Sequence, residues 1–367
     1  MIKNINVNIV TKCKNIYKIV KDYLFLIIIV GFVLCIFKEP DVVVKSVSSG
    51  LNICGNVVLP SLFPFMVICG FVNLSPMVEI VSKIFLPVTR FIFKLPENVG
   101  CLVFMSFIGG YPMGAKMVSD ALKRNEISTE VANRLMCFCV NAGPAFVVTA
   151  IGYVIWGNIK IGLVLLISHI LGSIIIATFL GVLYANKEVN SVVAKIKPLK
   201  YSEAFVKSVI DGSYAILHIF SFVIIFSVVV NLIKSHLFFN GALLNVVLSF
   251  LEITVGMKYV INLDGVASLL LSSFLISFSG LSIIFQIFYF VKDCNLNKKK
   301  IVLFRFIHGG ISALITYFMM FFIDDIKCTS IILYGNKIEF CQVSPLVSIV
   351  IFLLALTFII FTYDEIF

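Results

Sequence analysis

Long apolar segments alternate with short polar turns along almost the whole chain, and this pattern predicts membrane-spanning helices. A bilayer core of about 30 Å needs about 20 consecutive apolar residues in a helix, so the chain has room for roughly eight to eleven spans. We therefore expect an all-α, polytopic integral membrane protein without a separate soluble domain. The apolar segments fall at about residues 22–37, 53–73, 77–93, 99–122, 130–155, 160–184, 208–234, 240–262, 264–291, 301–323 and 344–362.

The composition of the 367 residues supports this class. Hydrophobic residues make up 60% of the chain and charged residues 13%, which leaves more apolar surface than a soluble protein of this length can bury. Much of the net charge of +10 lies in short turns beside apolar segments, where Lys and Arg set the topology. The charge therefore predicts an orientation in the lipid bilayer, and it does not indicate nucleic-acid binding.

The first apolar segment is preceded by a basic stretch. Residues 1–21 carry five lysines and no acidic residue, and no small-residue cleavage site follows the apolar run, as a signal peptide would require. For residues 1–45 we expect a cytoplasmic N-terminus and an uncleaved first span. The frequent Lys, Asn and Ile residues are typical of an AT-rich bacterial genome.

The segment 109–116 interrupts an apolar stretch with three glycines and a proline. A broken backbone survives in a bilayer only where protein buries it or where it lines a watery cavity. Gly110, Pro112 and Gly114 therefore form a candidate binding site of the kind that discontinuous helices build in transporters. Gly110 and Gly114 also match the GxxxG helix-contact motif, which is the alternative interpretation. We expect the nearby Lys116 to extend toward the membrane surface.

The two halves of the chain look alike in outline. Residues 46–184 and 208–323 each contain a long apolar segment, a second span and a short segment rich in small residues, at 106–112 and 273–280. Paired, glycine-interrupted segments in matching positions are typical of transporter cores built from repeats. We predict two pseudo-symmetric repeats joined by a basic linker, 185–207, and followed by a polar loop and a last span, 324–367.

The orientation of the two interrupted segments is left open by the charges. The three basic segments 1–21, 123–124 and 185–207 all lie in the cytoplasm if 99–122 crosses the membrane. Keeping the lysines at 298–300 inside as well requires 264–291 to re-enter instead of crossing. That arrangement would break the symmetry of the two halves.

Glu252 is the sharpest single candidate for chemistry, because it lies deep inside the apolar segment 240–262. A carboxylate at mid-bilayer costs roughly 2.5–3.5 kcal/mol unless it is paired or protonated. Two roles are open. Glu252 binds a solute or couples an ion or proton, or it is a protonated side chain that holds helices together.

Asn141 and Pro144 form a second candidate within one apolar segment. Pro144 lacks an N–H and obstructs the carbonyl four residues back, at Val140. That leaves a free carbonyl beside the Asn141 amide, which together suit a polar solute or a cation. The alternative is a packing kink in which Asn141 bonds between helices.

A polar stripe in the second half is the third candidate. Ser279 and Ser282, and Ser282 and Gln286, are spaced three and four residues apart, so they share one face of a helix. Ser277 adds a hydroxyl just before them. These side chains either line a pocket or bond between helices.

Other kinds of chemistry leave no signature in the sequence. The chain carries no P-loop, HExxH, GxSxG or zinc-type cysteine spacing, so we expect no enzyme activity, no metal site and no cofactor. Cys328 and Cys341 share one polar loop. They would form a disulfide only if that loop faces the outside, which the sequence leaves open.

These motifs together resemble the Gate, or nucleoside-recognition domain, family, and within it the YlbJ group of sporulation integral membrane proteins. The resemblance covers about residues 50–323. It implies a bacterial plasma-membrane protein of endospore formers, associated with spore formation and cortex development. It also implies Gate domains similar to parts of concentrative nucleoside transporters and of the ferrous-iron transporter. The matching segments are 59–65, 109–116, 141–146, 251–256 and 277–282.

The resulting expectation is a secondary transporter, or permease-like protein, for a small polar solute that is nucleoside-like or an ion. Its site would lie between the broken segments, with Asn141, Glu252 and Gln286 supplying side-chain contacts. The alternative is a scaffold without transport activity that recruits sporulation membrane proteins. Besides the lipid bilayer, the expected partner is therefore a solute in one case and protein in the other.

Overall fold

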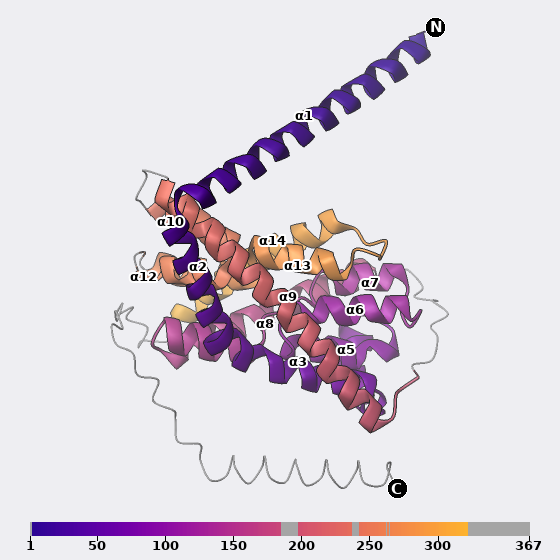
Figure 1. The fold of residues 1–367 in the computed structure, drawn as a ribbon. Coiled ribbons are helices and arrows are strands. Elements are labelled where there is room, and N and C mark those ends of the chain that lie inside the picture. Colours follow the sequence, from indigo (N-terminus) through magenta and orange to yellow (C-terminus); the bar gives the residue numbers. More distant parts are fainter. Residues whose placement is uncertain (1, 185–196, 237–241, 262, 264, 322–367) are drawn as a thin grey trace.

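Helices form all the regular structure in the part of the chain that the computed structural model describes, which is residues 2–184, 197–236, 242–261, 263 and 265–321 (Figure 1). Five helical stretches are long and apolar enough to cross a membrane: Pro40–Leu74, Ile159–Leu183, Tyr201–Ser235, Gly265–Phe290 and Lys298–Met320. The prediction of an all-α, multi-pass membrane protein is confirmed. The predicted last span and the cysteines Cys328 and Cys341 lie outside the described residues.

The elements follow one another in this order: α1 (Ile2–Lys38), α2 (Pro40–Ile53), η1 (Cys54–Val58), α3 (Leu59–Leu74), α4 (Met77–Pro87), η2 (Val88–Ile92), η3 (Glu97–Val99), α5 (Gly100–Ile108), α6 (Met113–Lys123), α7 (Thr129–Leu135), η4 (Phe146–Ile155), α8 (Ile159–Leu183), α9 (Tyr201–His236), α10 (Ala242–Leu251), α11 (Ile253–Val260), α12 (Gly265–Phe278), α13 (Gly280–Phe290) and α14 (Lys298–Met320).

Two long helical stretches, α2–α3 and α9, run side by side in opposite directions (Figure 1). At one end, the backbone N–H of Leu199 donates to the carbonyl of Leu74 at 2.8 Å. At the other end, Ser227 Oγ donates to the carbonyl of Ser46 at 3.1 Å, and Asn231 Nδ2 donates to Ser46 Oγ at 3.0 Å. Polar contacts at both ends therefore fix this antiparallel pair around which the shorter helices pack.

The segment 99–122 folds back on itself as a hairpin of α5 and α6. Asn98 Nδ2 donates to the carbonyl of Glu126 at 2.8 Å, so the two ends of the hairpin meet. A Cβ added to Gly114 would lie 3.3 Å from Ser106 Cβ, whereas residues eight apart in one helix are separated by about 12 Å. The tip is 109–112, where Gly110 has φ +72 and the Tyr111–Pro112 peptide is cis.

A second hairpin, α10–α11, replaces the single span predicted at 240–262. A Cβ added to Gly256 would lie 2.4 Å from Ser249 Cα, although seven residues of one helix would separate them by about 10 Å. The chain turns at Leu251 and Glu252, and Glu252 adopts an extended backbone with ψ 124. The span prediction was wrong because two short apolar half-helices read as one long apolar run.

Two other segments cross the molecule but are broken midway. The first is α7–η4, whose chain is irregular between 136 and 143; it runs antiparallel to α8, with Ser173 Oγ donating to the carbonyl of Phe138 at 2.7 Å. The second is α12–α13, broken where Ser279 and Gly280 have φ 82 and 75. It runs antiparallel to α14, and Thr316 Oγ1 donates to Ser273 Oγ at 2.7 Å.

The basic turns at the ends of α6 and α13 lie on one face of the protein. Lys123 Nζ is 3.5 Å from Asp293 Oδ2, Lys300 Nζ donates to the hydroxyl of Tyr184 at 3.1 Å, and Asn297 N donates to Asn133 Oδ1 at 2.8 Å. The positive-inside rule assigns this face to the cytoplasm. On that assignment 99–122 would re-enter from this face, and Gly265–Phe290 is long and apolar enough to cross; the topology of both segments stays a prediction.

The order of hairpin and broken crossing helix is the same in both halves of the chain. The segment 106–112, however, ends at a hairpin tip, while 273–280 lies in a crossing helix, so these two do not correspond as predicted. In the order along the chain, the hairpin α5–α6 corresponds to the hairpin α10–α11, and the broken helix α7–η4 corresponds to α12–α13. The two-repeat organisation and the boundaries 46–184, 185–207 and 208–323 stay predictions.

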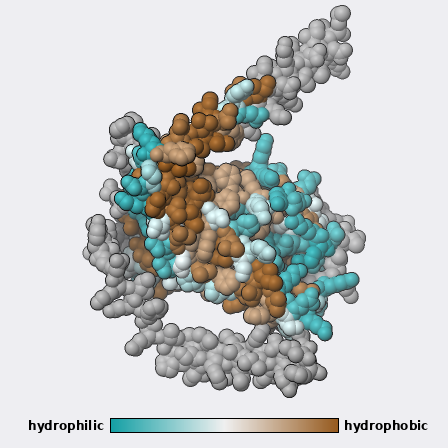
Figure 2. Space-filling model, in the orientation of Figure 1, coloured by the Kyte–Doolittle hydropathy of each residue, from teal (hydrophilic) through white to brown (hydrophobic). Residues whose placement is uncertain are grey.

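The surface agrees with a bilayer around the helices. Figure 2 shows hydrophobic residues between two hydrophilic margins on the face in view. Large apolar side chains are well exposed on several helices, among them Ile84 at 65%, Val182 at 70% and Leu314 at 61%. Lys116, expected at the membrane surface, is instead only 14% exposed and pairs with Asp120 at 2.7 Å and Asp211 at 3.3 Å.

Gly114→Ala tests the packing of the first hairpin against the broken helix. The new Cβ would lie 1.8 Å from the carbonyl oxygen of Cys139, so backbone must move, and we expect a loss of about 1–3 kcal/mol of stability. Thermal unfolding of the purified protein in detergent measures this. Gly310→Ala is the matched control, since nothing lies within 4 Å of its Cβ; equal unfolding temperatures for both variants would contradict the packing.

Candidate functional site

The two hairpin tips and the two helix breaks meet in the middle of the protein. The tip of α5–α6 touches the break in α7–η4, because a Cβ on Gly110 would lie 3.2 Å from the N of Gly143. The tip of α10–α11 touches the break in α12–α13, because a Cβ on Gly280 would lie 3.5 Å from the N of Ile253. Each tip is therefore packed against non-helical backbone.

Tyr111 joins the two halves of this centre. Its hydroxyl donates to the carbonyl of Ile276 at 3.2 Å, and its side chain is 3% exposed. The donor comes from the tip of α5–α6 and the acceptor from the last turn of α12, just before the break. One buried hydrogen bond thus connects elements 165 residues apart.

A small cavity of about 20 Å³ lies where these elements meet. That volume has room for about one water molecule. Its polar lining comes from four side chains, those of Tyr111, Glu252, Thr254 and Gln286, and the remainder is apolar. Of the predicted site residues, Glu252 and Gln286 are therefore brought together. The apolar lining consists of Val58, Leu62, Phe146, Ile219, Val223, Ile253 and Ile283.

Glu252 occupies the N-cap of α11 at the hairpin tip. Its Oε2 accepts from the backbone N of Val255 at 2.6 Å, and its Oε1 accepts from Thr254 Oγ1 at 3.1 Å. A carboxylate in this place satisfies free N–H groups and complements the positive end of the helix dipole. The side chain is 1% exposed, and the turn of the hairpin, not the middle of a span, explains why the chain tolerates it there.

The polar stripe predicted in the second half is divided by the break. Ser282 and Gln286 share α13, and Gln286 Nε2 donates to Ser282 Oγ at 3.4 Å. Ser279 precedes α13 in a left-handed conformation, and its buried hydroxyl has no hydrogen-bond partner among the described residues. Gln286 Oε1 is likewise buried without a partner there, so the cavity has an amide oxygen available to a ligand.

Asn141 and Ser277 belong to a separate hydrogen-bonded cluster and do not line the cavity. Asn141 Nδ2 donates to the carbonyl of Phe138 at 2.8 Å, which stabilises its own irregular segment. His169 Nε2 accepts from the N of Ala142 at 3.0 Å, and its Nδ1 is 2.8 Å from Ser277 Oγ. Ser277 in turn donates to Ser312 Oγ at 2.8 Å, which leaves His169 neutral with the proton on Nδ1.

The remaining predicted residues act through the backbone. Gly110 permits the break and Gly114 the close approach of Cys139, and the expectation that these residues bind a solute stays a prediction. Pro112 lies directly before α6, at the tip of the hairpin. The carbonyl of Val140, four residues before Pro144, lies in the irregular segment 136–143 and accepts from a side chain that was not among the predicted site residues.

That side chain is Arg305 of α14, which is fully buried. It donates to the carbonyls of Val140 and Cys137. His308, one turn further, is also fully buried and has its Nε2 2.8 Å from the carbonyl of His169. Arg305, His308 and His169 could have been found by the rule that selected Glu252, since ionisable residues inside apolar segments are rare and functional.

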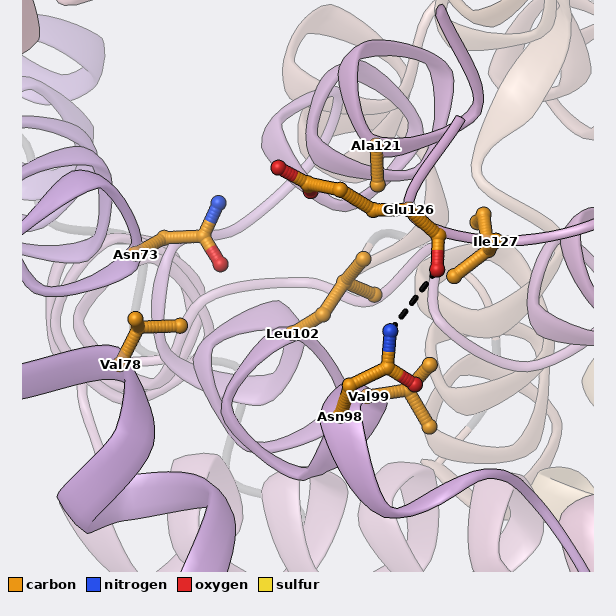
Figure 3. Close-up of a pocket in the computed structure, with 8 residues that line it drawn as sticks. All are labelled: Asn73, Val78, Asn98, Val99, Leu102, Ala121, Glu126 and Ile127. Atoms are coloured by element: carbon orange, nitrogen blue, oxygen red, sulfur yellow. Dashed lines mark hydrogen bonds between the residues drawn. The ribbon is translucent and has the colours of Figure 1, made fainter. Parts of the chain in front are cut away.

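A second cavity lies near the cytoplasmic face (Figure 3). It measures about 10 Å³ and is lined by Asn73, Asn98 and Glu126 among apolar side chains. Glu126 is already paired with Arg124 Nε at 2.7 Å. This cavity is at the lower limit of the size that holds one water molecule, so we do not assign it a ligand.

The charged and sulfur-bearing groups do not suggest a metal centre. No group of three or more His, Cys, Asp or Glu side chains is placed to hold a metal ion within the described ranges.

The chain is similar to the sporulation integral membrane protein YlbJ of Bacillus subtilis (strain 168). The two are 25% identical over 321 residues, which covers 76% of this chain and 78% of the relative. No protein-family model matches the chain. No solved structure matches it either.

Tyr111→Phe tests the bond that joins the two halves. It leaves the buried carbonyl of Ile276 without its donor, and we expect a loss of about 1–3 kcal/mol, measured by thermal unfolding in detergent. Tyr153→Phe is the control, because Tyr153 is 52% exposed. If both variants unfold at the wild-type temperature, the bond does not hold the halves together.

Proposed function

We propose that this homologue of a sporulation integral membrane protein is a secondary transporter, or permease-like protein, for a small polar solute or ion. The single observation that supports this most is the buried cavity where two hairpin tips and a broken crossing helix meet around Glu252. The name of the relative supports a role in sporulation at the membrane. Transport and the identity of the solute are our proposal.

The helix ends around the centre suit a polar ligand. The half-helices α6, α11 and α13 begin there, so their N-terminal N–H groups carry partial positive charge. The half-helices α5, α10 and α12 end there, and they offer carbonyl groups. Discontinuous helices in transporters use both kinds of end to bind solutes and ions.

Glu252 and Gln286 would supply the side-chain contacts. Gln286 Oε1 has no partner within the described residues, so it can accept a hydrogen bond from a ligand without losing another. Glu252 is held by the amide of Val255 and the hydroxyl of Thr254, so a ligand would share it with the end of α11. Binding at Glu252 would therefore loosen or tighten the tip of the second hairpin.

The size of the cavity restricts what this conformation can hold. About 20 Å³ accommodates a water molecule or a bare ion, whereas pockets for drug-sized ligands measure roughly 300–1,000 Å³. A nucleoside-like solute would require the hairpin tips to separate from the broken helices. The conformation described is thus a closed one, and opening toward either face would alternate access.

A scaffold without transport activity is the second candidate, and a specific observation favours it. The polar groups of Asn141, His169, Ser277 and Ser312 bond mostly to one another or to backbone. Such bonds could serve only to hold helices together. The lack of enzymatic activity that the sequence leads us to expect stays a prediction.

Glu252→Gln distinguishes transport from scaffolding. The amide keeps an oxygen that accepts from Val255 but removes the carboxylate charge, so we expect normal protein levels with flux reduced at least about tenfold, the effect of losing roughly one charged contact. Metabolite and ion profiling of spores from a deletion strain selects the solute, and uptake into proteoliposomes measures its flux.

Glu97→Gln is the matched control, because this glutamate is 63% exposed and forms a surface ion pair with Arg90; the variant should transport and sporulate normally. Asn141→Ala is measured beside it to test the cluster. If the Glu252 and Asn141 variants are both made normally, sporulate normally and show no altered flux, the scaffold is the better account.

A further inference from the structure

The irregular segment 137–143 is held by a buried positive charge from another helix. Arg305 lies on α14 with 0% exposure. Its Nη2 donates to the carbonyl of Cys137 at 2.9 Å, and its Nη1 donates to the carbonyl of Val140. Within the described residues, no acidic side chain forms an ion pair with Arg305.

This arrangement is unusual in its choice of partner for a buried charge. Arginine stays protonated in proteins, and a buried charge is normally paired with an opposite charge or held by a dense set of hydrogen bonds. Here the acceptors are backbone carbonyls that the break in α7–η4 has released. Unwound carbonyls of this kind coordinate Na⁺ in several transporters.

Several other polar groups of the segment have partners, whereas Asn141 Oδ1 is buried without one among the described residues. The carbonyl of Phe138 accepts from Ser173 Oγ at 2.7 Å and from Asn141 Nδ2 at 2.8 Å. The amide of Ala142 donates to His169 Nε2 at 3.0 Å. The carbonyls of Cys137 and Val140 are those that the guanidinium takes, and its planar fork spans two acceptors at once.

The helix that carries Arg305 is held by hydrogen bonds on the C-terminal side of that residue. His308 Nε2 lies 2.8 Å from the carbonyl of His169 on α8. Ser312 and Thr316 bond to Ser277 and Ser273 on α12 at 2.8 and 2.7 Å. The position of the charge is therefore set by α8 and α12, and it does not depend on the irregular segment that it stabilises.

We infer that Arg305 is a built-in cation that occupies the carbonyls which the unwound segment 137–143 would otherwise offer to Na⁺. Arg305 is thus a positioning residue for this segment, and the segment folds without a metal ion. The inference rests on the proposed function only for its consequence, that flux through the neighbouring cavity does not draw on a Na⁺ gradient.

Two native cysteines allow local opening of the segment 137–143 to be measured. Cys137 and Cys139 lie within it and are both 0% exposed, while Cys69 and Cys101 are equally buried elsewhere. Alkylation of each thiol in the purified full-length protein in lipid nanodiscs, read by peptide mass spectrometry, reports local opening at each place. The rates are compared in NaCl and in choline chloride, and then with millimolar guanidinium added.

For the wild-type protein we expect the same alkylation rate of Cys139 in NaCl and in choline chloride. For Arg305→Ala in choline chloride, we expect that rate to rise about tenfold or more, because two charge-assisted hydrogen bonds are lost. Guanidinium or Na⁺ should then slow it again by filling the vacated carbonyls. Cys69 and Cys101 should keep their wild-type rates.

Arg134→Ala is the matched control. Arg134 is also buried, at 2% exposure, and donates to one carbonyl, that of Phe93, at 2.8 Å, but it does not bond to the released carbonyls of Cys137 and Val140. Its loss should not make the Cys139 rate sensitive to Na⁺ or guanidinium. A structural defect alone would change the rate in both variants without rescue by either cation.

Three results would overturn the inference. They are a wild-type Cys139 rate that falls in NaCl, an Arg305→Ala rate equal to wild type, and a raised rate that neither cation lowers. If Arg305→Ala exposes every cysteine, Arg305→Lys decides, since it keeps the charge: a Na⁺-dependent rate in that variant contradicts the inference, and a Na⁺-independent rate supports it. None of these measurements requires a known solute, so loss of the transport proposal would leave them unaffected.

Discussion

Backbone N–H and C=O groups that are released inside a membrane protein must find partners within the protein, because the lipid offers none. The four interruptions of this fold are arranged by that constraint. Each hairpin tip packs on the break of a crossing helix, and the released groups bond to Glu252, His169, Arg305 and Tyr111. These four side chains satisfy backbone groups, whereas Ser279 Oγ and Gln286 Oε1 are buried without a partner among the described residues.

Functional chemistry would then be an additional use of the same groups. Glu252 caps α11 and also lines the cavity, so a ligand that engages it changes the stability of a hairpin tip. Gln286 contributes an acceptor that the fold leaves unused. A transporter needs such coupling between binding and movement, whereas a scaffold needs only the satisfied bonds. The cavity is compatible with a transporter and with a scaffold, and removing the charge of Glu252 distinguishes the two.

Local chemistry allowed several features to be predicted from the sequence. Glycines and Pro112 marked the break at 109–112, and Pro144 marked the carbonyl released at Val140. Whether a broken segment turns back or crosses could not be predicted, because it depends on contacts such as Gly256 with Ser249 and Gly114 with Cys139. Asn141 was expected to contact a solute, but its amide bonds to its own segment. Arg305 was identifiable in principle by the rule that selected Glu252, since both are charges within apolar segments.

Hydrogen exchange of the native protein in lipid nanodiscs tests the central claim most directly, because it measures whether the amides at the interruptions are satisfied. The account predicts that the amides of Ala142 and Val255, although outside regular helix or at its first turn, exchange as slowly as those in the flanking helices. Exchange at the rate of an exposed loop in the segments 136–143 and 251–256 would contradict it.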